Sequence, residues 1–230
     1  MVPLATCWLS GSSKLNRTRE QFANSQDSRL ALTAVWLSVF FGVLVWSAWA
    51  PHDYPTWWLE VAPALGAFIL LAVTRRTFPL TRLAYWLILG HAIVLMIGGH
   101  YTYAEVPAGD WLRDLVGGSR NNYDKLGHFV QGFVPAIVAR EILVRNQVVG
   151  RRGWLGFVVV CICLSISAFY ELVEWWVALL SQEAAEAFLG TQGYAWDTQS
   201  DMFLALIGAV LAVFFLSRWH DRQLQGLPLR

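Results

Sequence analysis

The sequence predicts an all-α, polytopic membrane protein with six transmembrane helices in one bundle. Hydrophobic residues make up 56% of the 230 residues, and the mean hydropathy is +0.45. Charged residues make up only 14%, against about 25% in an average soluble domain. The apolar residues also form blocks long enough to cross a hydrocarbon core of about 30 Å, which takes about 20 helical residues. Blocks of this length favour helices over a β-barrel.

The chain divides into a polar arm, a membrane domain and a short tail. Residues 1–29 are polar, and they contain no apolar stretch long enough for a signal peptide. Residues 30–218 hold the transmembrane domain, and 219–230 form the tail. Six apolar blocks are separated by connections that carry Pro, Gly or charged residues, and they lie at about 30–50, 57–73, 83–100, 126–144, 154–178 and 202–218. The second block is the least regular, because Glu60, Pro63 and Gly66 interrupt its first half.

Basic residues indicate the orientation, because cytoplasmic segments are enriched in Lys and Arg. The arm, the second connection, the fourth connection and the tail carry four, three, four and three of them, which is 14 of the 17. The N-terminus and the C-terminus are therefore predicted to be cytoplasmic. Twelve of the 16 acidic residues fall on the outer side, which favours a surface that meets cations, cationic substrates or a metal. No feature of the composition supports nucleic-acid binding.

The start of the fourth block carries polar groups from a loop into an apolar helix. His128 and Gln131 are three residues apart and share a helix face about one turn into the membrane. An ionisable group at this depth is costly without a partner, which favours a site role for His128. Asp124 also has a simpler interpretation as the N-cap of this helix.

The fifth block brings acids to the same predicted depth. Glu171 and Glu174 share a helix face near its outer end. Placement at the lipid interface explains Glu174. It explains Glu171 less well, because the stretch before Glu171 is almost wholly apolar.

The sixth block begins with Asp197 and Asp201, four residues apart on one face. Thr198 and Asp201 also match a capping-box pattern. Small residues continue the Asp201 face, so we expect this face to pack closely against another helix; they are Ala205, Gly208 and Ala212.

Seven side chains from four helices thus reach one depth on one side, and they form the predicted metal-ligand set: His100, Asp124, His128, Glu171, Glu174, Asp197 and Asp201. Imidazole and carboxylate ligands suit zinc, manganese or iron, and a bound ion would neutralise the acids and activate water. Without a metal, His128 and Glu171 are the candidate catalytic acid and base. Lys125 and Gln131 are expected to contact the substrate.

Three runs of residues resemble a known family: DKLGHF at 124–129, ELVEWW at 171–176 and DTQSD at 197–201. They are similar to the YjdF-like family of uncharacterised bacterial inner-membrane proteins, over about residues 30–220. This resemblance implies a multi-pass protein of the bacterial inner membrane, without a reaction or cofactor. The same order of polar residues is more distantly similar to the VanZ-like membrane proteins, which are associated with resistance to a lipoglycopeptide antibiotic. Ala205 stands where that pattern has an asparagine.

These observations favour an inner-membrane protein with an outward-facing His/carboxylate site. The site would bind or act on an envelope lipid or lipid-linked headgroup, with a divalent metal such as zinc or manganese. The sequence leaves open whether the protein is an enzyme. One alternative is a proton- or cation-coupled transporter, although the inner half of the fifth block offers only Ser165 and Ser167 as polar groups. Another is a non-enzymatic accessory or assembly subunit with a membrane-protein partner.

Overall fold

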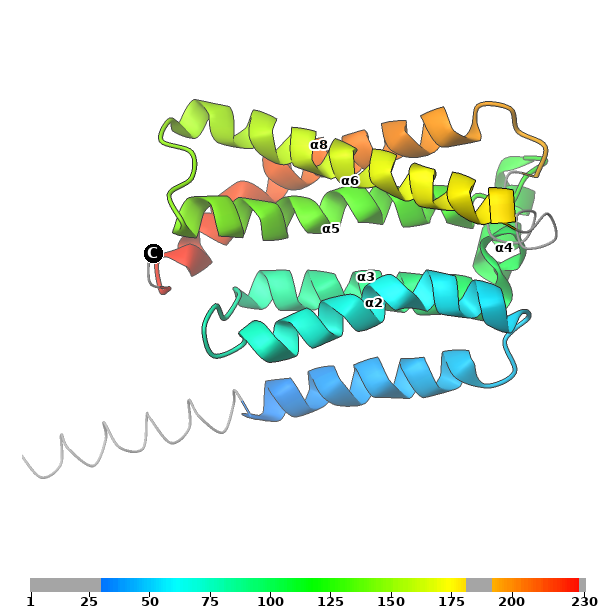
Figure 1. Cartoon of the computed structure of the whole chain (residues 1–230), viewed down its shortest axis with the longest axis horizontal. Helices are drawn as coiled ribbons and strands as arrows, with labels where there is room; N and C mark the ends of the chain where they lie inside the picture. The colour runs from blue at the N-terminus through cyan, green and yellow to red at the C-terminus, as the bar shows by residue number, and fades with distance from the viewer. Residues whose placement is uncertain (1–29, 181–191, 228–230) are drawn as a thin grey trace, which may run out of the picture. The chain divides into compact units, whose positions relative to one another are not determined.

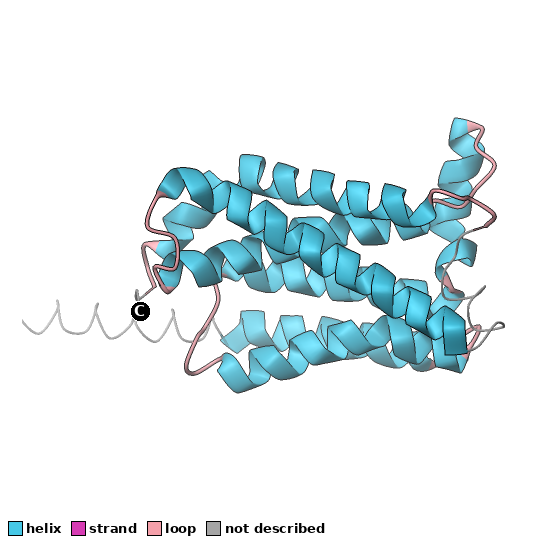
Figure 2. Ribbon diagram, turned by 45° about the horizontal axis from the view of Figure 1, so that its top comes forward, coloured by secondary structure: helices cyan, strands magenta, loops and turns pink. Residues whose placement is uncertain are grey.

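The computed structural model describes residues 30–180 and 192–227, so the predicted arm at 1–29 lies outside the described residues. In these ranges all regular structure is helical (Figure 2). Six described helices are long and apolar enough to cross a membrane, which confirms the predicted number. They are Leu30–Ala48, α2 (Tyr54–Thr74), α3 (Arg82–Tyr101), α5 (Tyr123–Arg145), α6 (Arg152–Leu180) and α8 (Asp197–Leu224) (Figure 1).

The chain divides into two units, residues 1–42 and 43–230. In the first unit the described part is helical, and the rings of Trp36 and Phe40 stack with their centroids 5.3 Å apart. In the second unit, α2 pairs with α3, while α5, α6 and α8 pack together (Figure 1). An apolar core of the second unit lies where α3, α5, α6 and α8 meet.

Helix α2 is continuous through Pro63 and Gly66, where the sequence suggested an irregular start. It begins at Tyr54 because Asp53 caps it, accepting a hydrogen bond from the Thr56 amide at 2.7 Å. A proline in the first turn is tolerated because the amides there have no helical partner. Glu60 therefore lies inside a regular helix and projects a buried carboxylate into the bundle.

The contact between α5 and α8 is the most extensive in the second unit. A Cβ atom at Gly132 of α5 would overlap the backbone of Ala205, and one at Gly208 of α8 would overlap the backbone of α5. The two backbones therefore approach closely, as small residues allow between membrane helices. The predicted small-residue face is confirmed, since Ala205 and Ala212 are fully buried. This contact holds Asp201, one turn before Ala205, against α5.

Two short helices follow α3, namely η1 (Tyr103–Glu105) and α4 (Pro107–Val116). In α4, Trp111 and Leu115 are exposed, while Arg113 pairs with acids on the other face of the helix. Asn121 links α4 to the start of α5. Its Nδ2 donates to Val106 O at 2.9 Å, just before α4, and to Asp110 Oδ1 of α4 at 3.0 Å. An amphipathic helix with an exposed tryptophan is typical of a membrane interface.

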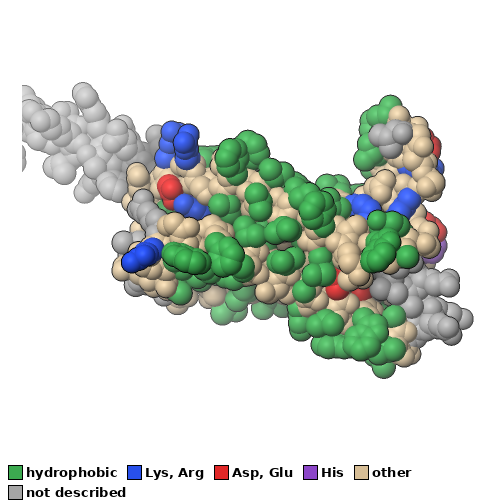
Figure 3. All heavy atoms as spheres, turned by 90° about the horizontal axis from the view of Figure 1, so that it is seen from above, with side chains coloured by type: hydrophobic (Ala, Val, Ile, Leu, Met, Phe, Trp, Pro, Cys, Tyr) green, Lys and Arg blue, Asp and Glu red, His purple; other side chains and the backbone are tan. Residues whose placement is uncertain are grey.

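We call the end of the second unit that carries Asp124 the Asp124 end, and the opposite end the Glu141 end. The positive-inside count predicts that the Asp124 end faces outward. On the face shown in Figure 3, hydrophobic side chains cover the length of the helices and charged side chains gather at the ends. This distribution is expected of a surface that meets lipid along its middle.

The Glu141 end contains a buried polar network. Glu141 accepts hydrogen bonds from Thr81 N at 3.0 Å and Thr81 Oγ1 at 2.7 Å, and from Arg145 Nη1 and His220 Nε2 at 3.1 Å each. Arg140 Nη1 lies 3.1 Å from His220 Nδ1. Because a guanidinium only donates, Nδ1 is the acceptor and the ring proton sits on Nε2. The network joins the start of α3 to α5 and α8.

This network was not predicted. The sequence interpretation counted Arg140, Glu141 and Arg145 only as charges of a cytoplasmic connection, and it gave His220 no role. All four side chains are buried, and α8 continues to Leu224, so His220 belongs to a helix.

Candidate functional site

His128 is the centre of the Asp124 end. It lies in the second turn of α5, and 5% of it is exposed. Its Nε2 is 3.4 Å from Asp124 Oδ1 and 3.9 Å from Glu174 Oε1. Its Nδ1 is 3.1 Å from Gln131 Oε1 and 3.7 Å from Glu171 Oε1. Helices α5 and α6 thus surround one imidazole with three carboxylates and an amide.

Two basic side chains hold the acids of α8. Lys125 Nζ is 2.6 Å from Ser200 Oγ, 3.4 Å from Asp201 Oδ1 and 3.7 Å from Asp197 Oδ1. Arg120 Nη1 is 2.5 Å from Asp197 Oδ1, and its Nη2 is 3.5 Å from Asp124 Oδ2. Lys125, which we expected to contact the substrate, therefore already pairs with α8. Asp197 is held mainly by Arg120.

The acids at these helix starts are not caps. The N-cap of α5 is Asn122, so Asp124 is the second residue of the helix and the N-cap interpretation is wrong. The N-cap of α8 is Trp196, which makes no side-chain cap bond, so the capping box from Thr198 to Asp201 is also wrong. Neither Asp124 nor Asp201 is therefore held as a helix cap, and both lie near basic side chains instead.

Two overlapping groups around His128 have the spacing of metal ligands. One is Asp124, His128 and Asp201, and the other is His128, Glu171 and Glu174; in each, the ligand atoms lie within 4.8 Å of one another. Two ligands at about 2.0–2.2 Å from zinc lie at most about 4.4 Å apart, so small side-chain rotations would complete either group.

Glu171 adds an independent observation. Its side chain is 7% exposed, and its Oε1, the atom nearest His128, has no hydrogen-bond partner among the described residues. Its carboxylate also lies within hydrogen-bonding reach of Thr198. A buried oxygen without a donor is costly, and a bound cation would compensate it.

The structure does not bring His100 to the other predicted ligands. His100 Nδ1 lies 3.1 Å from Ser47 O, and its ring packs against Trp46 and Tyr101, with centroids 4.5 Å and 4.6 Å away. His100 lies at the predicted depth in the membrane. However, the face of α3 that carries His100 packs against the residues that precede α2, and not against α5 or α6.

Glu60 was missed as a member of the Asp124 end. It is buried, and Tyr170 donates to its Oε2 at 3.4 Å. Tyr103 also hydrogen-bonds to the Glu60 side chain. Burial and the nearby Glu60 raise the pKa of Tyr103 well above its usual range, so Tyr103 remains a neutral donor. The available signal was an ionisable residue inside an apolar span, which we interpreted only as an interruption.

The Asp124 end carries more acid than base. Among the described residues around His128 there are six buried carboxylates and three basic side chains, Arg120, Lys125 and His128 itself. The carboxylates are Glu60, Asp124, Glu171, Glu174, Asp197 and Asp201. Acidic groups therefore outnumber basic groups around His128.

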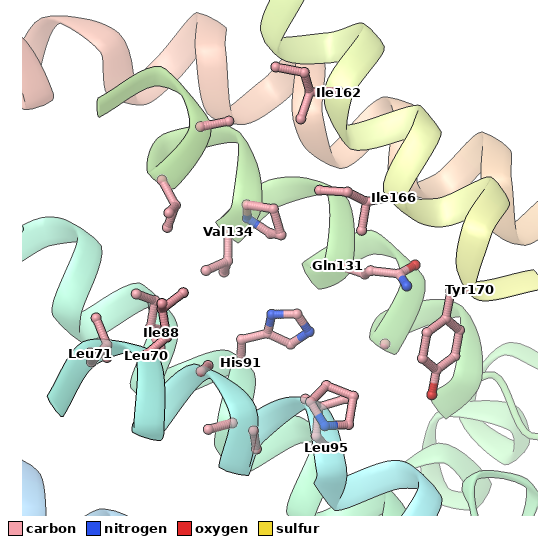
Figure 4. A pocket seen from close by; sticks show the side chains of 18 of the residues that line it. Leu70, Leu71, Ile88, His91, Leu95, Gln131, Val134, Ile162, Ile166 and Tyr170 are labelled. Carbon is pink, nitrogen blue, oxygen red and sulfur yellow. The ribbon is translucent and has the colours of Figure 1, made fainter. Parts of the chain in front are cut away.

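A cavity of about 660 Å³ runs from the Asp124 end along the bundle, between α2 and α3 on one side and α5 and α6 on the other. Its polar end is lined by Glu60, Asp124, His128 and Glu174, with Tyr103, Gln131 and Tyr170 beside them. Beyond this end the described wall is mostly apolar, and its polar side chains are His91 near mid-span and Thr74 and Asn146 toward the Glu141 end. Figure 4 shows His91 among the apolar side chains Leu70, Leu71, Ile88 and Leu95. The described lining includes no Lys or Arg.

Comparison with known proteins shows the family. Residues 32–222 match the family described as predicted membrane protein (DUF2238). Over 187 residues the chain is 55% identical to the inner membrane protein YjdF of Escherichia coli (strain K12), covering 81% of this chain and 90% of that protein. No solved structure matches the chain. The chain is therefore an integral inner-membrane protein and belongs to the DUF2238 family, together with YjdF.

Proposed function

We propose that the protein binds a divalent cation at an outward-facing His/carboxylate site and uses it to bind or act on the headgroup of an envelope lipid. The observation that carries the proposal is the setting of His128, whose ring nitrogens lie within 3.9 Å of carboxylates from two helices. Imidazole combined with carboxylates is a donor set that suits zinc, manganese or iron.

The ligand group that best fits a cation is His128, Glu171 and Glu174. Asp124 and Asp201 already lie near Arg120 and Lys125, whereas no described Lys or Arg pairs with either glutamate. Three protein ligands with an open position are typical of catalytic zinc sites. A cation would also pair with these carboxylates, whose ionised form is costly to bury without a partner.

The surroundings of His128 suit a metal ligand. Metal-binding histidines usually donate their second ring nitrogen to an acceptor that fixes the ring. Here Asp124 lies near Nε2 and Gln131 near Nδ1, so either ring nitrogen can bind the ion while the other is held. When Nε2 binds the ion, Gln131 holds Nδ1 and orients the ring. With an ion bound, the chemistry supplied would be activation of water or polarisation of a headgroup oxygen.

Metal analysis of the purified protein tests this proposal. We expect about one divalent ion per chain after loading with zinc or manganese and removal of excess, measured by inductively coupled plasma mass spectrometry. His128→Ala and Glu171→Gln should lose it. The matched controls His52→Ala and Glu105→Gln should keep it, because these two residues form an exposed pair at 3.5 Å elsewhere in the second unit. Equal metal content near zero in all five proteins would exclude a metal site.

Transport of protons or cations draws less support. It needs ionisable groups that continue toward the Glu141 end, and beyond His91 the described cavity lining offers only Thr74 and Asn146 as polar side chains, neither of which is ionisable. Ion flux into liposomes that depends on Glu171 would favour transport over the lipid-headgroup function. An accessory role would be favoured if alanine at Glu171 and His128 lowered only the amount of protein in the membrane.

A further inference from the structure

The apolar part of the cavity is not fully enclosed. Several of its lining side chains are exposed in the described second unit, among them Leu70 at 63%, Ile142 at 44% and Ile166 at 41%. Because the family is integral to the membrane, these side chains meet lipid chains. A hydrocarbon chain can therefore enter from the bilayer without crossing water.

The length of the cavity also suits a lipid chain. On α5 its lining extends from Asp124 to Asn146, which is about 33 Å at about 1.5 Å per residue. A bilayer core is about 30 Å thick, so the apolar part is longer than a chain of one leaflet requires. A volume of about 660 Å³ lies inside the range of about 300–1,000 Å³ for ligand pockets.

The polar end of the cavity is acidic and therefore favours a headgroup with a positively charged group. Its charged lining consists of three carboxylates and His128, without a Lys or Arg in the described lining. Glu60 belongs to neither group of metal ligands, so a metal at His128 would leave its carboxyl group free to pair with a headgroup. Tyr103 and Tyr170 lie against Glu60 and also line the cavity. Aromatic rings beside a carboxylate are a setting that binds ammonium groups.

We propose that the cavity holds a hydrocarbon chain of an outer-leaflet phospholipid with a primary amine on its headgroup, and that the ammonium pairs with Glu60 beside Tyr103 and Tyr170. The proposal rests on the proposed lipid-headgroup function and names its substrate class. The phosphate of the same headgroup would then lie toward His128, where a cation at the glutamates would hold it.

Native mass spectrometry of the full-length protein with two lipids of identical chains tests the headgroup. The probes are dioleoyl phosphatidylethanolamine and dioleoyl phosphatidylglycerol at equal concentration in detergent. We expect the amine lipid to bind about tenfold more tightly, the value of one charge-assisted hydrogen bond. Glu60→Gln keeps the shape of the side chain and should remove this preference. Equal binding of both lipids by the unaltered protein, or an unchanged preference in Glu60→Gln, would overturn the proposal.

A second pair of variants tests the chain. Ala67→Trp fills the apolar part of the cavity, away from the carboxylates, and should reduce binding of both lipids at least severalfold. The control is Ala62→Trp, on the same helix but outside the cavity lining, and it should bind both lipids normally. Unchanged binding in Ala67→Trp would overturn the chain assignment.

The metal content of each variant separates the two proposals. Normal metal content with no lipid preference would remove the aminophospholipid and leave the metal site. A lipid preference that depends on Glu60 in a protein without metal would remove the metal site and leave the aminophospholipid.

Discussion

The substitution Glu141→Gln tests how much the buried network at the Glu141 end contributes to stability. All the groups that contact the Glu141 carboxylate are donors: the amide and hydroxyl of Thr81, Arg145 Nη1 and His220 Nε2. An amide in its place keeps one acceptor oxygen. Its NH2 group would face a donor, and Arg145, which is also buried, would lose its carboxylate.

The expected loss follows from the burial of this pair. Removing one partner of a buried ion pair costs about 3–5 kcal/mol. For a chain of this size each kcal/mol lowers the melting temperature by about 2–4 °C, so we expect a drop of about 10 °C. The assay is thermal unfolding of the detergent-purified protein, followed by the loss of its size-exclusion peak.

The matched control is Asp221→Asn in the same network. Asp221 pairs with Arg140 at 2.7 Å, but its side chain is 50% exposed, and such pairs contribute about 1 kcal/mol or less. We expect its melting temperature to fall by at most about 4 °C. If Glu141→Gln costs no more than Asp221→Asn, burial of the network does not stabilise this end of the protein.

Three further predictions concern packing, the interfacial helix and orientation. Gly132→Leu places a side chain against the backbone of α8 and should cost at least about 3 kcal/mol in the same thermal assay, whereas Gly90→Leu, which faces open space, should cost little. Asn121→Ala removes the bonds that hold α4, so hydrogen exchange of the α4 amides should speed up while α5 stays protected. In a cysteine-free background, Gly118→Cys should react with an impermeant maleimide in spheroplasts and Gln147→Cys only after lysis; the opposite pattern would place the Asp124 end in the cytoplasm.

The spans were predictable because each is an apolar block that the membrane requires to be helical. Helix α4 was not predicted, since ten residues are too few to span. A signal was nevertheless present: Ala108, Trp111, Leu112 and Leu115 have the i, i+3, i+4, i+7 spacing of an amphipathic helix. The regular start of α2 was missed because Pro63 and Gly66 were interpreted as interruptions and Asp53 was not recognised as a cap.

The membrane depth of the candidate site residues could be predicted from the sequence, but the helices that meet around them could not. Spacing placed His128, Glu171 and Asp201 at one level, and the structure brings these three side chains to one end of the bundle. The same reasoning placed His100 with them, because periodicity gives the face of a helix but not the helix that this face meets. Glu60 was missed for the same reason, since only the packing of α2 turns it toward Tyr170.

The burial of the network at the Glu141 end could not be predicted from the sequence. Arg140 and Arg145 satisfy the positive-inside pattern, so the sequence gives no sign that they are buried. Their burial depends on Glu141 and His220, which are 79 residues apart and meet only when α5 packs on α8.

X-ray absorption at the metal edge of the zinc- or manganese-loaded protein tests most directly whether His128 and its neighbouring carboxylates form a cation site. We expect a first shell at about 2.0–2.2 Å with one imidazole and carboxylate oxygens. The imidazole scattering should persist in His100→Ala, whereas His128→Ala should retain no bound metal. A shell that contains only water oxygens, or one that loses its imidazole in His100→Ala, would contradict the assignment.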